Sequence, residues 1–282
     1  MSLELKGAPV AEKIRAGITE KMTMCRMKGV EPMMAIVRVG DRSDDVAYEI
    51  QVRRSCEKVG LSYKVFDFPE DITQARFEVE FSIINADPNI HGILLFRPLP
   101  ASLDEGFISS LVDPGKDIDC MNPENLSRLF LGREDAFPPC TSEAVVEMLK
   151  YYEIPLEGAN VVIVNRSMVL GKPLAMLLLQ ENATVTVCHS RTKDLPSIMK
   201  RADIVVSGIG KARFFDKTCF SKKNTVIDVG INFIDGRMTG DTDPNTAEVA
   251  AAVSPVPGGV GSVTTMILLR HAVDSAWRKA NG

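Results

Sequence analysis

A loop of prolines and glycines near the end of the sequence is well suited to contact a ligand through its backbone. It lies within Val253–Thr264 and includes Pro257, Gly258 and Gly259. Proline fixes φ, whereas glycine allows positive φ and leaves peptide N–H groups unshielded by a Cβ. A helix-like tail follows, and a helix N-terminus favours negative charge. The loop is therefore expected to approach an anionic ligand, although taken alone it is also compatible with a rigid connector.

Two consecutive strand ends carry side chains that suit phosphate. The first runs into Asn165, Arg166 and Ser167, and the second into Ser190 and Arg191. The glycine fingerprint G-x-G-x-x-G is absent. In a dinucleotide-binding fold the second strand end lies at the adenosine ribose, where an acid favours NAD whereas arginine and serine favour a 2′-phosphate. Single residues of these types are often ordinary surface groups, but their occurrence at both ends favours NADP binding.

The elements that would position these groups alternate along the chain. Apolar runs rich in β-branched residues alternate with amphipathic segments of helix length, which is typical of βαβ units and a parallel sheet. The expected strands are Met33–Val39, Tyr63–Phe68, Gly92–Phe96, Asn160–Asn165, Thr184–His189, Ile204–Ser207 and Thr225–Gly230. The expected helices are Val10–Lys28, Asp45–Val59, Ile72–Asn85, Ser142–Tyr152, Pro173–Glu181, Leu195–Lys200 and Thr264–Ala280.

The alternation breaks between about Pro100 and Pro139, a region dense in Pro, Asp, Gly and Asn. This break predicts two α/β domains, one formed by residues 1–138 with 264–282 and a Rossmann-like one formed by residues 139–263. The C-terminal helix is expected to pack back on the first domain. Thr141, followed by an acidic residue in the first turn, is expected to cap the helix that opens the second domain.

Composition narrows the class of protein. The 282 residues are 45% hydrophobic and 25% charged with a net charge of −4, so no global charge favours nucleic acid or an anionic membrane. No apolar run reaches the roughly 20 residues needed to span a bilayer, and the start lacks a signal-peptide core, so a cytoplasmic location is expected. The six cysteines form no C-x-x-C pair and only three histidines occur, so no metal site is expected.

Taken in order along the chain, the motifs resemble those of the bifunctional methylenetetrahydrofolate dehydrogenase/methenyltetrahydrofolate cyclohydrolase family over essentially the whole length. The matching segments are His91-Gly-Ile-Leu94 with Pro98-Leu-Pro100, Lys116-Asp-Ile-Asp119, Pro139-Cys-Thr141, Arg166-Ser167 with Gly171-Lys-Pro173, His189-Ser190, Ile227-Asp-Val-Gly-Ile-Asn232 and Pro255-Val-Pro-Gly-Gly-Val-Gly261. The resemblance implies a two-domain α/β homodimer, with a tetrahydrofolate derivative bound in a cleft and NADP on the C-terminal domain.

The resemblance also implies roles for individual residues. The folate-site tyrosine falls on Tyr48 and the folate-contacting aspartate on Asp119. The loop residues Pro257, Gly258 and Gly259 correspond to the segment beside the folate pocket. The implied dinucleotide contacts are Asn165, Arg166, Ser167, Ser190 and Ile231, with Arg191 beside them.

Several positions depart from the family pattern. Val52 stands where the family has a lysine, four residues after Tyr48, and Phe96 stands where it has a glutamine. Positions i and i+4 share one face of a helix, so the missing ammonium would have lain beside the tyrosine hydroxyl. Asp45 replaces a serine. Cys120 and Asn165 both replace glycines.

These departures set the expected activity. Hydride transfer to NADP needs mainly alignment of the two reactants, whereas cyclohydrolysis needs a positioned acid or base. We therefore expect dehydrogenase activity with weak or lost cyclohydrolase activity, unless Asp45 replaces the missing base. Two alternatives stay open, because Val52 and Phe96 make the pocket more apolar: an oxidoreductase with a different substrate, and a non-catalytic protein that binds folate or dinucleotide.

Overall fold

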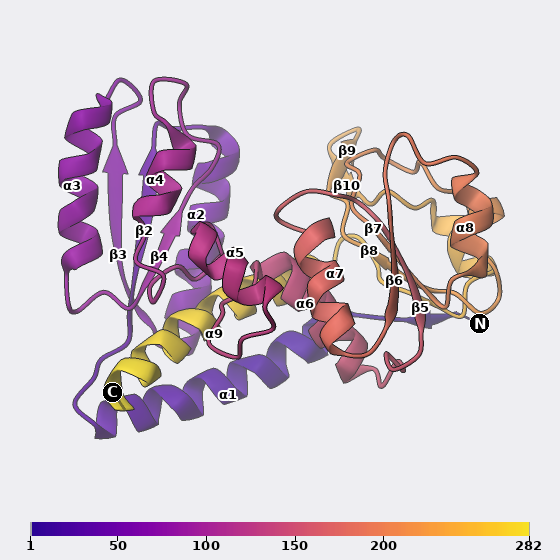
Figure 1. Cartoon of the computed structure of the whole chain (residues 1–282), viewed down its shortest axis with the longest axis horizontal. Coiled ribbons are helices and arrows are strands. Elements are labelled where there is room, and N and C mark those ends of the chain that lie inside the picture. The colour runs from indigo at the N-terminus through magenta and orange to yellow at the C-terminus, as the bar shows by residue number, and fades with distance from the viewer. Residues whose placement is uncertain (1, 282) are drawn as a thin grey trace. The chain divides into compact units, whose positions relative to one another are not determined.

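The computed structural model describes residues 2–281, and the chain divides into two compact α/β units (Figure 1). Unit 1 takes in the residues up to 12 together with residues 141–264. Unit 2 takes in residues 13–140 and those from 265 onward. None of the helices in the described part of the chain is long and apolar enough to cross a membrane.

Unit 1 is built on a six-stranded sheet with the order β1-β11-β8-β7-β5-β6. All of its strands pair in parallel. The strands are β1 (Leu3–Glu4), β5 (Asn160–Val164), β6 (Thr184–Cys188), β7 (Ile204–Ser207), β8 (Thr225–Asp228) and β11 (Ala252–Val253). The chain moves from β5 to one side to form β6 and then returns to the other side to form β7. This reversal makes the carboxyl end of β5 the topological switch point, where open α/β sheets bind their ligands.

Short helices and a hairpin complete unit 1. They are α6 (Cys140–Tyr151), α7 (Gly171–Gln180), α8 (Leu195–Arg201), the 3₁₀ helices η1 (Lys217–Cys219) and η2 (Pro244–Glu248), and the antiparallel pair β9 (Asn232–Ile234) and β10 (Arg237–Thr239). Buried apolar residues from β5, β7 and β8 pack with Met199 and Phe220 in one core. Strands β5, β7 and β8 are buried on both faces, which explains why they are continuous apolar runs in the sequence.

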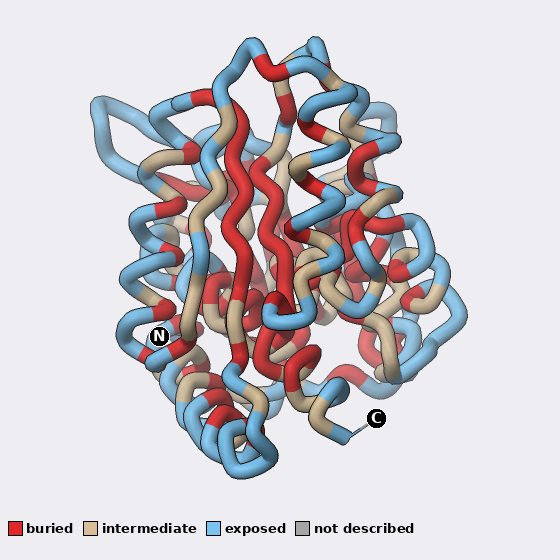
Figure 2. Tube along the Cα trace, turned by 90° about the vertical axis from the view of Figure 1, so that its left-hand side faces the viewer, coloured by how far each residue is buried: buried red, intermediate tan, exposed pale blue. Residues whose placement is uncertain are grey.

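Unit 2 is built on a three-stranded parallel sheet with the order β3-β2-β4. The strands are β2 (Met33–Val39), β3 (Ser62–Phe68) and β4 (Gly92–Leu95). The helices are α2 (Ser43–Val59), α3 (Gln74–Ala86), α4 (Glu105–Leu111) and α5 (Pro123–Phe130), together with the greater part of α1 (Gly7–Met27) and of α9 (Val260–Asn281), whose first residues belong to unit 1. Figure 2 shows long buried stretches along the strands. Phe77 and Phe81 of α3 are fully buried against the sheet residues, each contributing about 1.5–3 kcal/mol of burial.

The C-terminal helix α9 packs within unit 2 from Thr265 onward, which confirms the predicted return of the tail to the first domain. Asp274 forms an ion pair with Lys21 of α1. Trp277 lies under the Lys28 ammonium, which is 5.0 Å from the ring centroid. Ser275 donates a hydrogen bond of 2.6 Å to the Gly115 carbonyl.

The strands and helices follow the predicted pattern to within a few residues, with three differences. Residues up to 12 cluster with unit 1, because Leu3 and Glu4 pair with Ala252 and Val253. The segment from about Pro100 to Pro139, predicted as the domain junction without strands or helices of its own being assigned, contains α4 and α5, capped by Asp104 and Asn122. Thr141 is not an N-cap, since α6 already begins at Cys140.

Candidate active site

In unit 2 the side chains of Tyr48 and Val52 lie one turn apart on α2. Tyr48 is half-buried and Val52 is fully buried. Phe96, directly after β4, is also buried. Its ring meets the Tyr48 ring at 69°, with centroids 5.8 Å apart. The two residues that replace the lysine and the glutamine therefore give the tyrosine an apolar surrounding.

The carboxylate of Asp119 influences the ionisation of Tyr48 through its charge. One of its carboxylate oxygens accepts a hydrogen bond of 3.0 Å from the Cys140 backbone N–H. Burial raises the pKa of the Tyr48 hydroxyl well above its usual range, and the charges of Asp119 and Cys140 raise it further. Tyr48 is therefore a neutral phenol near pH 7, able to donate a hydrogen bond but unable to act as a base.

A hydroxyl that the sequence analysis missed contacts this phenol. Thr265, in the first turns of α9, is almost fully buried and forms a side-chain hydrogen bond with Tyr48. Gln51 of α2 donates a hydrogen bond of 3.3 Å from Nε2 to the Thr265 Oγ1. The side chains of Gln51, Thr265 and Tyr48 are thus linked by consecutive hydrogen bonds, next to the apolar side chains of Val52 and Phe96. Gln51 and Thr265 are 214 residues apart, so no local pattern could have paired them.

Asp45, the predicted replacement base, is held by an arginine. Both of its carboxylate oxygens accept hydrogen bonds of 2.8 Å from the Arg42 guanidinium. Arg42 also donates to the Arg97 carbonyl at 3.1 Å, which ties the start of α2 to the segment after Phe96. This bidentate pairing engages both carboxylate oxygens of Asp45 with the guanidinium.

The residue after Asp119 adopts a backbone conformation that favours glycine. Cys120 has φ of 56°, in the left-handed region, and its side chain is buried. A non-glycine residue costs roughly 1 kcal/mol or more there. The neighbouring carbonyl of Ile118 accepts from the Cys140 thiol at 3.2 Å and lies 2.8 Å from Nδ1 of His271. These contacts fix the backbone that presents Asp119.

In unit 1 the predicted dinucleotide residues lie at the switch point. Asn165 follows β5, and Arg166 and Ser167 are exposed in the turn that leads to α7. The turn is tight, because a Cβ on Gly171 would lie 2.0 Å from the Asn165 carbonyl oxygen. Glycine is therefore required at position 171.

The next strand end presents Ser190 and Arg191 to solvent. The turn is closed by His189, whose N–H donates to the Thr192 hydroxyl at 2.8 Å and whose Nδ1 accepts from the Arg191 N–H at 3.2 Å. Ile231, after β8, is 61% exposed and thus free to contact a ligand. Arg166, Ser190 and Arg191 are all exposed in unit 1 at the carboxyl ends of β5 and β6.

The proline and glycine loop also belongs to unit 1, where Pro257 and Gly258 are exposed. Gly258 has φ of 101°, and its carbonyl accepts a hydrogen bond of 2.8 Å from the Gly7 N–H. A Cβ on Gly7 would lie 2.0 Å from the Gly259 carbonyl oxygen. The start of α1 therefore braces this loop by direct backbone contact, and α9 begins at Val260, four residues earlier than predicted.

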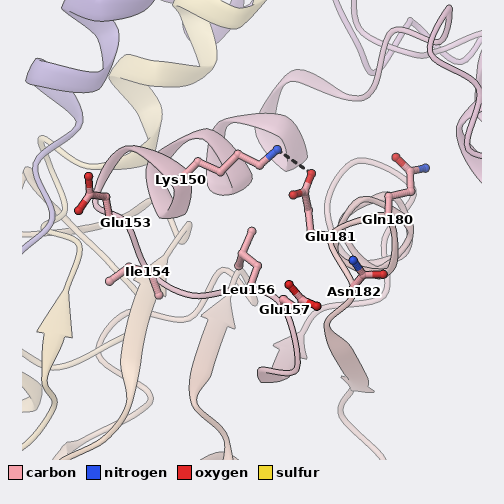
Figure 3. A pocket seen from close by; sticks show the side chains of 8 residues that line it. All are labelled: Lys150, Glu153, Ile154, Leu156, Glu157, Gln180, Glu181 and Asn182. Carbon is pink, nitrogen blue, oxygen red and sulfur yellow. Dashed lines mark hydrogen bonds and ion pairs between the residues drawn. The ribbon is translucent and has the colours of Figure 1, made fainter.

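A separate hollow of about 400 Å³ lies at the opposite ends of β5 and β6 (Figure 3). Its lining includes Glu153, Glu157 and Glu181, the last paired with Lys150 at 2.6 Å. The hollow lies beside the amino ends of the strands and its charge is mainly acidic, so it does not suit a phosphorylated ligand.

Comparison with known proteins gives a uniform result. Residues 5–119 match the model of the tetrahydrofolate dehydrogenase/cyclohydrolase catalytic domain, and residues 139–280 match that of the tetrahydrofolate dehydrogenase/cyclohydrolase NAD(P)-binding domain. The bifunctional protein FolD of Alkaliphilus oremlandii is 50% identical over 97% of this chain and 96% of its own length. That of Clostridium botulinum is 49% identical over 99% of this chain and 100% of its own.

Solved structures agree. The FolD dehydrogenase/cyclohydrolase of Campylobacter jejuni superposes with a TM-score of 0.96 at 35% identity, covering 99% of this chain and 100% of that one. The FolD of Trypanosoma brucei, complexed with NADP and an inhibitor, superposes with a TM-score of 0.93 at 33% identity, covering 100% of this chain and 99% of that one.

Proposed function

Since this chain belongs to the tetrahydrofolate dehydrogenase/cyclohydrolase family, we propose that it oxidises 5,10-methylenetetrahydrofolate to 5,10-methenyltetrahydrofolate with NADP, and that it hydrolyses the methenyl product weakly or not at all. The observation that carries the second part is the fully buried valine at position 52, one helical turn from Tyr48.

The residues of unit 1 fit NADP. The exposed Arg166 and Arg191 guanidinium groups and the Ser190 hydroxyl can hold phosphate, and the end of β6 offers no acid that would favour an unphosphorylated ribose. NADP, when bound, accepts the hydride that the substrate gives up. The protein's task in this step is to align the two ligands, and alignment does not require a lysine.

In unit 2 the retained polar groups serve binding. The neutral Tyr48 hydroxyl can donate a hydrogen bond to a ligand, and the Asp119 carboxylate can accept one, so together they can orient a polar heterocycle. We therefore expect the dehydrogenase step to require a bound folate substrate. The oxidation itself needs no further protein group, because the nicotinamide takes the hydride.

Cyclohydrolysis needs an acid or base, which the described side chains around Tyr48 supply poorly. Water must add to the methenyl carbon and a C–N bond must break, so a proton has to be taken up and delivered. Val52 has no ionisable group, Tyr48 stays protonated, and both carboxylate oxygens of Asp45 are paired with Arg42. A missing general acid or base typically lowers a rate by about 10²–10⁴-fold.

The test is a paired assay of dehydrogenase and cyclohydrolase activity on purified protein, each dehydrogenase rate being measured with NADP and with NAD. The proposal expects methylenetetrahydrofolate-dependent reduction of NADP and slow hydrolysis of methenyltetrahydrofolate. Rapid hydrolysis would contradict the second part, and the absence of folate-dependent NADP reduction would contradict the first.

Phe96 supports the alternatives, because its ring covers one side of Tyr48 where the family has a glutamine. An oxidoreductase with another one-carbon or heterocyclic substrate would reduce NADP only with that substrate. A non-catalytic binding protein would bind tetrahydrofolate and NADP without turnover. The same assay, with binding of each ligand measured beside it, separates both from the proposed function.

The proposal extends to the assembly and location of the protein. Because the motifs resemble those of this family, we expect a homodimer that acts in the cytoplasm on tetrahydrofolate derivatives. Light scattering on the eluting protein distinguishes a dimer from a monomer, and fractionation of cells with an antibody to the chain tests the location.

A further inference from the structure

The side chain of Asn165 is hydrogen-bonded on both sides at the switch point. Its Oδ1 accepts from the Ser167 N–H at 2.7 Å and from the Gly171 N–H at 3.0 Å. Its Nδ2 donates to the Gly208 carbonyl, after β7, at 2.5 Å. The partners fix the orientation of the amide, because the oxygen faces two donors and the nitrogen faces an acceptor.

These bonds use the backbone donors at the start of α7. A helix ordinarily begins with four N–H groups that lack a partner within the helix, and these groups bind anions. Here Gly171 donates to Asn165, and Lys172 donates to the Ser167 carbonyl at 3.1 Å. Pro173 has no N–H, and Leu174 donates to the Leu170 carbonyl at 2.9 Å. The first turn of α7 therefore has no donor left for a ligand.

Two N–H groups of the turn before the helix are occupied in the same way. The Leu170 N–H donates to the Ser167 Oγ at 3.1 Å, and the Ser167 N–H is taken by Asn165. A neutral carboxamide oxygen thus stands against the N–H groups that would otherwise meet a pyrophosphate oxygen. The side chains available to an anion are those of Arg166 in this turn and of Ser190 and Arg191 at the next strand end.

We propose that Asn165 is an affinity-determining residue for the dinucleotide, because its carboxamide occupies the α7 donors and so weakens the hold on the pyrophosphate. The inference rests on the proposed function, in that it takes NADP as the ligand of unit 1. The pyrophosphate is common to NAD and NADP, so the weakening applies equally to both. Ser190 and Arg191 then contact the 2′-phosphate, which only NADP carries, so NADP binds more tightly than NAD.

The test is calorimetric titration of the full chain with NADP and, separately, with NAD, which requires neither folate nor turnover. Asn165→Ala frees the Ser167 and Gly171 N–H groups without the added flexibility of glycine. We expect both dissociation constants to fall about tenfold, while their ratio changes by less than about twofold. Asn165→Asp keeps the acceptor oxygen and adds a negative charge, so both cofactors should bind more weakly.

Asn160→Ala is the matched control, because Asn160 lies at the opposite end of β5 and hydrogen-bonds to Asp203. It should leave both dissociation constants unchanged. Thermal melts establish that each variant folds.

Weaker or unchanged binding in Asn165→Ala, or a change confined to one cofactor, overturns the inference. If the wild type binds neither cofactor, binding gained by Asn165→Ala supports it and continued failure overturns it. A chain that binds NADP but does not oxidise methylenetetrahydrofolate contradicts the proposed catalytic function alone.

Discussion

The Phe96 ring lies edge-on to the Tyr48 ring, at a centroid distance of 5.8 Å, on the wall where the family pattern has an amide side chain. Such a pair contributes about 0.5–1.5 kcal/mol beyond the area that it buries. It also removes a hydrogen-bonding group from beside the tyrosine. Together with the buried Val52 it makes the surroundings of the Tyr48 ring more apolar.

Returning the charge should return part of the hydrolytic activity. In Val52→Lys an ammonium stands one turn from the Tyr48 hydroxyl, and we expect the rate of methenyltetrahydrofolate hydrolysis to rise about 10²-fold. The free energy of unfolding should fall by about 2–4 kcal/mol, because Val52 is fully buried. Val52→Met is the control for length without charge. Equal hydrolysis rates in the two variants would argue against the proposed reason for the weak activity.

Thr265 should affect catalysis only through Tyr48. We expect Thr265→Val to lower kcat/KM of the dehydrogenase about fivefold to tenfold, the effect of one hydrogen bond, and Thr265→Ser to retain most of it. In a Tyr48→Phe background the valine substitution should cost little more, since its partner is gone. Additive losses in the double variant would show that Thr265 acts on packing alone.

His91 should make the folded state sensitive to mild acid. Burial, and then the charges of Lys279 and Lys116, lower the pKa of His91 to about 4. The unfolded chain takes up this proton near pH 6.5, whereas the folded chain does not until about pH 4. Stability is therefore present above pH 6.5 and is lost as the pH falls towards 4, by up to about 3 kcal/mol.

The measurement is denaturant unfolding between pH 7 and pH 4 for the wild type and for His91→Asn. Asparagine can still accept the hydrogen bond that His91 Nδ1 takes from the Met33 N–H at 3.3 Å. The free energy of unfolding is plotted against pH for both proteins. The difference between the two slopes gives the contribution of His91, because the buried carboxylates are the same in both. Identical slopes would rule out this origin of the acid sensitivity.

Gly171→Ala should disrupt the turn at the switch point. The added Cβ would lie 2.0 Å from the Asn165 carbonyl oxygen, where backbone and not a flexible side chain must move. We expect a loss of about 3–5 kcal/mol in the free energy of unfolding, and NADP affinity should fall as well. Gly17→Ala is the matched control, because a Cβ there meets nothing within 4 Å and should stabilise α1 by about 0.5–1 kcal/mol. A Gly171→Ala protein as stable as the wild type would show that this turn can relax.

The sequence predicts this fold well where single segments carry enough information. Strand β2 appears as one apolar run because both of its faces are buried, and the prediction matches its bounds. Strands β1 and β11 have only two residues each, too few for any periodicity, and they pair across almost the whole chain. Helix α5 was missed because its start lies among prolines and asparagines, although Asn122 caps it and the proline fits its first turn.

The candidate site divides in the same way. Tyr48, Asp119, Arg166 and Ser190 are identified by motifs, because their identities are fixed by local sequence. The partners that adjust them are not: Thr265 reaches Tyr48 from another helix, and Gly7 reaches Gly258 from the far end of the sequence. Such contacts depend on the path of the chain, which a linear pattern does not contain.

The pairing of β1 with β11 has a consequence for how the protein is made. Leu3 leaves the ribosome well before its partner Ala252, which follows only when the long intervening segment has been synthesised. Residues 13–140 can meanwhile form the sheet of unit 2, whose strands are close in sequence. The β1 edge of the unit 1 sheet is thus assembled late, and until then β1 has no neighbouring strand to pair with.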